Sequence, residues 1–253
     1  MKLSSIKQKE GEKMTTILAL QGSPRGSKGN TDVMLQEFLR GAASAGATTE
    51  TVYLNKLELN HCTGCYSCWI KTPGVCIFKD DMPEILEKMR QCDVLVIATP
   101  VYSRSMTSLT KTAIDRMLPL ADPHFVKMGD IYKHPSRYNR QYKTVLISNC
   151  GFPNMKEFDA LRHIFRLREE LGHTVMAGEL LMPSGVVLTL EELKEMLKNY
   201  YDSFYRAGVE VVKSGRISSE TEQSVQKPPF DPEDFFEIAN QKWDKALQEA
   251  GLL

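Results

Sequence analysis

A loop at residues 22–31, Gly-Ser-Pro-Arg-Gly-Ser-Lys-Gly-Asn-Thr, contains the side chains of this chain that are best suited to binding an anion. It follows a short apolar run and opens a segment with helical character. Backbone N–H groups and the helix dipole favour negative charge at such a position, and Arg25 and Lys28 add positive charge. The loop therefore predicts a phosphate site, with an ordinary polar turn and a good helix cap as the alternative.

Two common phosphate motifs do not fit this loop. A P-loop has the pattern G-x-x-x-x-G-K-[ST], but counting from Gly22 the last three places hold Ser27, Lys28 and Gly29. The second glycine and the magnesium-binding hydroxyl are therefore missing. A dinucleotide motif G-x-G-x-x-G is also absent, since the glycines fall at 22, 26 and 29. The remaining interpretation is a loop that holds one phosphate monoester without a metal ion.

Two further loops have the composition expected around a planar ring. Residues 99–106 read Thr-Pro-Val-Tyr-Ser-Arg-Ser-Met, and residues 148–153 read Ser-Asn-Cys-Gly-Phe-Pro. Each follows an apolar strand candidate, and in open parallel sheets ligands bind at the carboxyl ends of the strands. One phosphate loop and two such loops predict a mononucleotide site. Simple packing or turn roles for Tyr102, Met106 and Phe152 are the alternative.

The elements that must position these loops alternate along the chain. Strands are expected at 16–21, 49–54, 93–99, 143–149 and 174–181, and helices at 32–45, 82–90, 107–118, 156–171 and 190–213. The third and fourth strands are continuous apolar runs, which is typical of strands covered on both faces. The alternation predicts an α/β fold with three layers, built on a doubly wound, five-stranded parallel sheet.

The chain length suits one large α/β domain with additions. At 253 residues, we expect this domain over 15–215 and a flexible, charged N-terminal arm over 1–14. A C-terminal extension over 216–253 contains an amphipathic helix at 233–247. The long loops at 55–80 and 121–142 are expected to be functional or flexible.

The charge balance and apolar pattern exclude several classes. Lys plus Arg and Asp plus Glu each number 32, so neither a nucleic-acid surface nor a general anionic-membrane surface is indicated. No apolar run reaches the length of a membrane span, and no secretory signal follows the polar start. We therefore expect a cytoplasmic protein that binds neither membrane nor nucleic acid.

Four of the six cysteines are clustered within residues 62–76. Cys62, Cys65, Cys68 and Cys76 follow the spacing C-x2-C-x2-C-x7-C. In a reducing compartment such a cluster indicates a metal site, an iron–sulfur cluster or redox chemistry. A [4Fe–4S] cluster, thiols that bind no metal, and a structural zinc site or a disulfide all remain open.

The motifs together resemble one superfamily. They lie at residues 22–25, 29–31, 62–68, 74–76, 80–82 and 99–102, with Asn149-Cys150-Gly151 as the best match further along. Over about residues 15 to 120 the chain resembles the flavodoxin-like superfamily of FMN-dependent NAD(P)H oxidoreductases. This group includes the NADPH-dependent FMN reductases and the iron–sulfur flavoproteins. The resemblance implies a flavodoxin-like fold with a C-terminal helical extension.

The resemblance also implies a cofactor and the residues that bind it. The cofactor is FMN, with its phosphate surrounded by Ser23, Arg25, Ser27, Asn30 and Thr31. The isoalloxazine ring would be lined by Pro100, Val101, Tyr102, Ser103, Met106, Asn149, Cys150, Gly151 and Phe152. No protein side chain is assigned a catalytic role, because the flavin carries the redox chemistry.

The function implied is an FMN-dependent oxidoreductase that uses NAD(P)H as co-substrate and reduces quinones, flavins or similar small acceptors. The alternative is an electron-transfer iron–sulfur flavoprotein, in which Cys62, Cys65, Cys68 and Cys76 ligate a [4Fe–4S] cluster beside the flavin and the partner is ferredoxin-like. The interval from Cys68 to Cys76 is longer than expected for that branch. A ligand-binding or sensory module is a third hypothesis. A homodimer or higher homo-oligomer is expected in each case.

Overall fold

Five parallel strands form one sheet in the computed structural model, which describes residues 14–253. The arm expected at 1–14 lies outside the described residues, apart from Met14. The strand order is β2-β1-β3-β6-β7, so the direction of winding reverses between β1 and β3. The strands are β1 (Thr16–Gln21), β2 (Thr48–Tyr53), β3 (Val94–Ala98), β6 (Tyr142–Asn149) and β7 (Thr174–Met182). The predicted doubly wound α/β sheet is confirmed.

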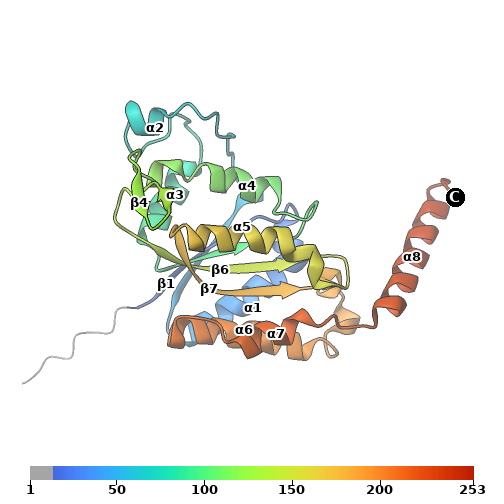
Figure 1. The fold of residues 1–253 in the computed structure, drawn as a ribbon. Coiled ribbons are helices and arrows are strands. Elements are labelled where there is room, and N and C mark those ends of the chain that lie inside the picture. The colour runs from blue at the N-terminus through green and yellow to red at the C-terminus, as the bar shows by residue number, and fades with distance from the viewer. Residues whose placement is uncertain (1–13) are drawn as a thin grey trace, which may run out of the picture.

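Helices cover both faces of this sheet and give three layers (Figure 1). One layer contains α1 (Asn30–Ser44), α6 (Lys198–Ser214) and α7 (Ser219–Gln226). The other contains α3 (Met82–Gln91), α4 (Ser108–Asp115) and α5 (Asp159–Glu170). Successive residues of β1 alternate between the two cores, as the period of a strand requires: Ile17 packs with the α1 side and Leu18 with the α3 side.

Helices α1 and α6 cross at two glycines. A Cβ built on Gly41 would lie 1.9 Å from the carbonyl oxygen of Tyr205, and one on Gly208 would lie 1.9 Å from that of Phe38. Real side chains do not approach backbone so closely, so neither position accepts even a methyl group. The two helices therefore pack backbone against backbone, which fixes α1 against the C-terminal part of the domain.

Several local elements differ from the sequence-based expectation. Helix α6 begins at Lys198 and not at 190, because the preceding segment forms 3-10 turns that include Glu191–Leu193. Helix α7, the four-residue α2 (Ser67–Ile70) and a hairpin of β4 (Val126–Met128) and β5 (Ile131–Lys133) were not predicted. Each is short or polar, so it lacks the apolar period on which such predictions rest.

The C-terminal segment divides into a packed part and a projecting part. Helix α7 lies against α6 and β7, whereas α8 (Pro232–Glu249) extends away from the rest of the structure (Figure 1). No residue of α8 is buried. Within residues 14–253, no helix has both the length and the apolar character needed to cross a membrane.

Candidate functional site

The loop between β1 and α1 is held in a defined shape by its own side chains. Gln21 Nε2 donates to the carbonyl oxygen of Gly26 at 3.0 Å, and Gln21 Oε1 accepts from the Ser23 N–H at 2.9 Å. Gly26 has a φ of +53°, in the left-handed region that favours glycine. Thr107 Oγ1 donates to the carbonyl oxygen of Gly22 at 2.6 Å, which connects the loop to the start of α4.

A pocket of about 130 Å³ opens beside this loop, at the carboxyl edge of the sheet. It brings together the loops after β1, β3 and β6, as the topology predicts. The predicted cofactor-binding residues that line it are Ser23, Arg25, Asn30, Thr31, Pro100, Val101, Tyr102, Asn149, Cys150 and Gly151.

Four other predicted residues do not line this pocket. Ser27 is exposed in a 3-10 turn, Gly26–Lys28, and Ser103 is exposed at the tip of its loop. Met106 is buried in the hydrophobic core on the α3 side, so its apolar character reflects packing. Phe152 is 52% exposed, next to the lining residue Gly151.

A fourth loop, after β7, also contributes to the pocket and was not predicted. Val186 lines the pocket, and the N–H of Thr189 donates to Asn30 Oδ1 at 3.0 Å. The hydroxyl of Ser184 is buried without a hydrogen-bond partner in the described part of the chain. The available sequence signal was Pro183-Ser184-Gly185, which directly follows the fifth strand at the same edge of the sheet.

The bottom of the pocket is polar and ordered. Thr31 Oγ1 donates to Asn149 Oδ1 at 2.6 Å, which joins the first loop to the loop after β6. Ser23, Asn30 and Thr31 are all buried. The first N–H groups of α1 have no acceptor within the helix, and Arg25 adds a positive charge beside them. This arrangement suits a phosphate group.

The mouth of the pocket is apolar and exposed. Tyr102 and Val186, which line the pocket, are 49% and 45% exposed. Tyr102 is followed by two consecutive left-handed residues, Ser103 at φ +48° and Arg104 at φ +60°, which cost roughly 1–3 kcal/mol each. A polar base and an apolar mouth together suit a ligand with a phosphate at one end and a flat ring at the other, which is the chemistry of FMN.

Cys150 lies in this pocket as a neutral thiol. Burial raises its pKa to about 11, and its Sγ donates to the carbonyl oxygen of Phe152 at 3.2 Å. A thiol with this pKa is not ionised at neutral pH, so it contributes packing and not nucleophilic chemistry.

The four clustered cysteines line one small cavity of about 20 Å³. Cys68 is buried, and burial raises the pKa of its thiol. Cys65 is exposed, and hydrogen bonds from Ser67 lower the pKa of its thiol. Within residues 14–253, no three His, Cys, Asp or Glu residues converge as ligands of a single metal ion. The structure thus groups the four thiols around a shared space without directing them at one point.

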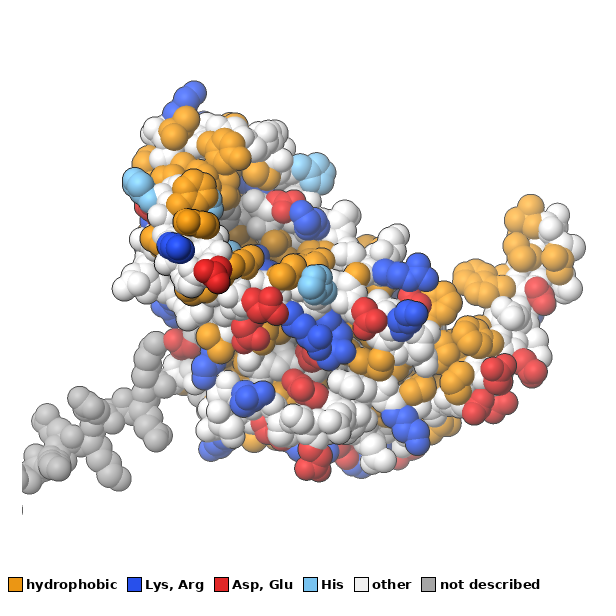
Figure 2. Space-filling view, in the orientation of Figure 1, with side chains coloured by type: hydrophobic (Ala, Val, Ile, Leu, Met, Phe, Trp, Pro, Cys, Tyr) orange, Lys and Arg blue, Asp and Glu red, His pale blue; other side chains and the backbone are white. Residues whose placement is uncertain are grey.

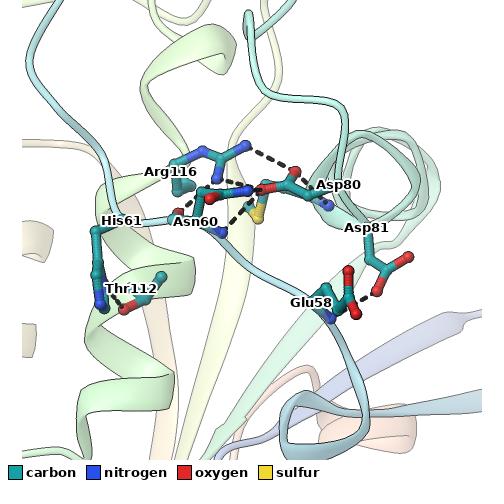
Figure 3. Close-up of polar contacts among 8 residues, drawn as sticks. Glu58, Asn60, His61, Asp80, Asp81, Thr112 and Arg116 are labelled. Carbon is teal, nitrogen blue, oxygen red and sulfur yellow. Dashed lines mark hydrogen bonds and ion pairs between the residues drawn. The ribbon is translucent and has the colours of Figure 1, made fainter.

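A buried ion pair holds the cysteine-bearing loop against α4 (Figure 3). Arg116 donates to both carboxylate oxygens of Asp80, from Nη1 at 2.7 Å and from Nη2 at 2.9 Å. The side chains are 1% and 2% exposed. Asp80 also accepts from the N–H groups of Asn60 and Met82. These hydrogen bonds and the adjacent guanidinium lower the pKa of the Asp80 carboxyl, although burial opposes them.

Arg116 also lies beside the thiols. It lines the cysteine cavity, its Nε is buried without a hydrogen-bond partner among residues 14–253, and the Cys76 thiol is one of the groups that raise its pKa. The charge of Arg116 is already paired with Asp80, so the fit of this cavity to a thiolate-bound group rests on the four sulfur atoms that surround one space.

The cysteine cavity and the pocket lie at opposite ends of α4. The residue preceding α4, Thr107, bonds to the phosphate loop, whereas Asp115 and Arg116 at the other end line the cysteine cavity. The helix between them spans roughly 12 Å. The resemblance implied a cluster beside the flavin, but within one chain the two sites are separate.

Comparison with known proteins identifies the family. The family model for NADPH-dependent FMN reductases matches residues 15–185, and the chain belongs to this family. The predicted resemblance is therefore confirmed.

Curated relatives include iron–sulfur flavoproteins and a putative NAD(P)H-dependent FMN-containing oxidoreductase. An iron–sulfur flavoprotein of Archaeoglobus fulgidus is 38% identical over 102 residues, which is 40% of this chain and 45% of that protein. The putative NAD(P)H-dependent FMN-containing oxidoreductase YwqN of Bacillus subtilis is 34% identical over 116 residues, 43% of this chain and 56% of that protein. The chain thus spans about half the length of these relatives.

Solved structures share the fold at low sequence identity. An FMN-dependent NADH-azoreductase of Bacillus anthracis, in complex with FMN, has a TM-score of 0.60 at 16% identity, over 79% of this chain and 100% of that chain. The NAD(P)H:quinone oxidoreductase of Methanothermobacter marburgensis has a TM-score of 0.58 at 15% identity, over 78% of this chain and 96% of that chain.

The Asp80–Arg116 pair generates a stability prediction. Asp80→Asn removes the charge and leaves a buried guanidinium uncompensated, so we expect the free energy of unfolding at pH 7 to fall by about 3 kcal/mol. Because the pKa of Asp80 is lowered in the folded state, its contribution is present above the ordinary carboxyl pKa of about 3.9 and is lost as the pH falls below it. Urea unfolding at several pH values should show that the free energies of unfolding of the parent protein and of Asp80→Asn approach each other below about pH 4.

Asp81→Asn provides the control for this prediction. Asp81 is the next residue and accepts from the Glu58 N–H at 2.8 Å, but among residues 14–253 it has no buried cation as a partner. Equal stability of the two variants at pH 7 would contradict the role given to the ion pair.

Proposed function

We propose that the protein is an FMN-dependent NAD(P)H oxidoreductase that reduces quinones, flavins or similar small acceptors. The observation that carries the proposal is the single pocket with a phosphate-binding loop at its base and exposed apolar side chains at its mouth. Membership of the NADPH-dependent FMN reductase family supports it, and so does the similarity to YwqN of Bacillus subtilis, a putative NAD(P)H-dependent FMN-containing oxidoreductase.

Each part of the pocket has a defined task in this proposal. Arg25 and the hydroxyl and amide groups of Ser23, Asn30 and Thr31 would hold the phosphate. Tyr102 and Val186 would cover part of the ring and exclude water from it. Bound FMN supplies hydride transfer from the nicotinamide to the acceptor. The protein then needs no general base, and its contribution is binding, orientation and electrostatics.

Replacing Arg25 and Thr31 together by alanine tests the phosphate loop. The double variant loses one charged and one neutral hydrogen-bond donor to the phosphate, so we expect the Kd for FMN to rise about 100-fold. Fluorescence quenching of added FMN measures this Kd. Arg40→Ala, which removes a cation from the far end of the same helix, should leave it unchanged. An unaltered flavin affinity in the double variant would contradict the assignment.

The cysteine cavity favours a second candidate, an iron–sulfur flavoprotein that exchanges electrons with a ferredoxin-like partner. Four thiols around one space suit a thiolate-bound cluster. The iron–sulfur flavoproteins among the relatives support this candidate. Cys62, Cys65, Cys68 and Cys76 would be the ligands, and the cluster would supply one-electron transfer.

Iron and sulfide content separates the two candidates. Anaerobically prepared protein with a [4Fe–4S] cluster should contain about four iron atoms and four acid-labile sulfides per chain. Cys68→Ala should lose both, whereas Cys92→Ala, which removes a thiol buried elsewhere in the core, should retain both. Protein that contains no iron or sulfide would leave the flavin reductase as the proposal, and one zinc per chain would indicate a structural metal site.

We also propose that the protein is a homo-oligomer and that α8 contributes to its interface. Phe236, Ile238 and Trp243 on this projecting helix are 39%, 54% and 69% exposed, and Figure 2 shows apolar side chains along it. Phe235 in the first turn of α8 packs against the core on the α1 side, but the rest of this amphipathic helix projects from the domain, which favours a second copy as its partner. A cytoplasmic location is part of this proposal, since free thiols persist in reducing compartments.

Trp243→Glu tests the role of α8. A charge at the centre of an apolar contact should shift the protein to a lower mass in light scattering after size exclusion. Gln241→Glu adds the same charge on an exposed polar position and should leave the mass unchanged. Equal masses for both variants and the parent would remove α8 from the interface.

A further inference from the structure

A larger cavity, of about 360 Å³, opens at the opposite edge of the sheet from the pocket described above. Its floor includes Tyr142 and Thr144 near the start of β6, Thr174 at the start of β7 and Leu95 near the start of β3. The amino ends of these parallel strands lie away from the edge that carries the phosphate loop. Small-molecule pockets in proteins measure about 300–1,000 Å³, and this cavity falls within that range.

One side of the cavity is apolar and the other is cationic. The apolar side is formed by α3, β3, α4 and the turn after α4, through Met89, Leu95, Ile114, Met117 and Leu120. The cationic side is formed by the long loop after α4 and by the end of α5, through Lys133, Arg140 and Arg168, and His134 and His173 line the same side. Asp115 is the one carboxylate among the lining residues, and Lys111 already pairs with it at 2.6 Å.

Arg168 carries a charge that the described part of the chain does not balance. It is partly buried, and its guanidinium makes no hydrogen bond or ion pair with any of residues 14–253. Burial lowers its pKa. Arg140, by contrast, bonds to the carbonyl oxygen of Gln91 and pairs with Asp93 at 3.4 Å. Lys133 donates to the carbonyl oxygen of Gly172 at 3.4 Å.

The neighbouring histidine is affected by the same excess of positive charge. Burial lowers the pKa of His173, and the charges of Arg168, Lys133 and His134 lower it further. A partly buried arginine without a counter-charge is costly, and a bound anion would remove that cost.

We propose that this cavity is a binding site for a small organic anion, with an apolar body against α3 and α4 and a carboxylate or phosphate on Arg168 and Lys133. Carboxylate and phosphate match the paired donors of a guanidinium. The proposal assigns a role to the long loop at 121–142, because Lys133, His134 and Arg140 of that loop form the cationic side. It does not depend on the flavin function, since the two sites share no residue.

Calorimetric titration of the FMN-saturated protein with three naphthalene compounds tests the proposal. The probes are 2-naphthoate, 2-naphthyl phosphate and the neutral 2-naphthamide, and the first two distinguish a carboxylate from a phosphate. We expect saturable binding of at least one anion and binding of the amide at least about tenfold weaker. Arg168→Gln should weaken anion binding about tenfold or more, and Arg168→Lys should restore part of it.

Two controls locate the binding event. Arg166→Gln removes the same charge from an exposed position on the same helix and should leave the affinity unchanged. The Arg25 and Thr31 double variant should also bind the probes as the parent does. Circular dichroism of Arg168→Gln verifies that the fold is retained, and Arg168→Lys supplies the comparison if it is not.

Four results would overturn the proposal. The first two are that neither anion binds saturably at millimolar concentration, and that the neutral amide binds as tightly as the anions. The third is that Arg168→Gln binds the anions as tightly as the parent protein does. The fourth is that the Arg25 and Thr31 double variant loses probe binding. The last result would show that probe binding depends on the loop at 22–31 and not on this cavity. A lower mass of Arg168→Gln in solution, without probe binding by the parent, would identify the cavity as an interface between copies.

Discussion

The parallel arrangement of all five strands is the constraint on which the rest of the structure depends. It delivers the carboxyl end of every strand to one edge of the sheet, where the loops after β1, β3, β6 and β7 meet. The reversal of winding between β1 and β3 leaves an opening there that no crossover helix fills. Hydrogen bonds between these loops, such as that from Thr31 to Asn149, hold them together as one ordered pocket.

The same topology places the carboxyl end of α4 away from this pocket, beside the cysteine cavity. The Asp80–Arg116 pair fixes the cysteine loop there. The cationic cavity lies next to it and shares Asp115 and Leu118 as lining residues. The proposed flavin pocket at one edge, and the cysteine cavity and the cationic cavity near the other, are three separate places in the domain.

The sequence was informative wherever a single segment determined its own structure. The continuous apolar runs identified β3 and β6, and the glycine- and hydroxyl-rich composition identified the loop that contains Ser23 and Arg25. It was less informative where distant segments meet. Val186 joins the pocket from more than 150 residues along the chain, and Arg168 has the pattern of an exposed helix position. Met106 was predicted at the ring but is buried in the core, because an apolar residue in a loop suits a ring contact and a core contact equally well.

The glycine contact between α1 and α6 has a consequence for the ligand end of α1. Gly41 lies roughly 16 Å along the helix from Asn30, the first residue of α1. Close backbone packing at Gly41 and Gly208 opposes sliding of α1 along α6, so the fold itself holds the amino end of α1. Part of the entropy of ordering this end would then be lost during folding and not on binding, so the phosphate of the proposed FMN would meet a preorganised site.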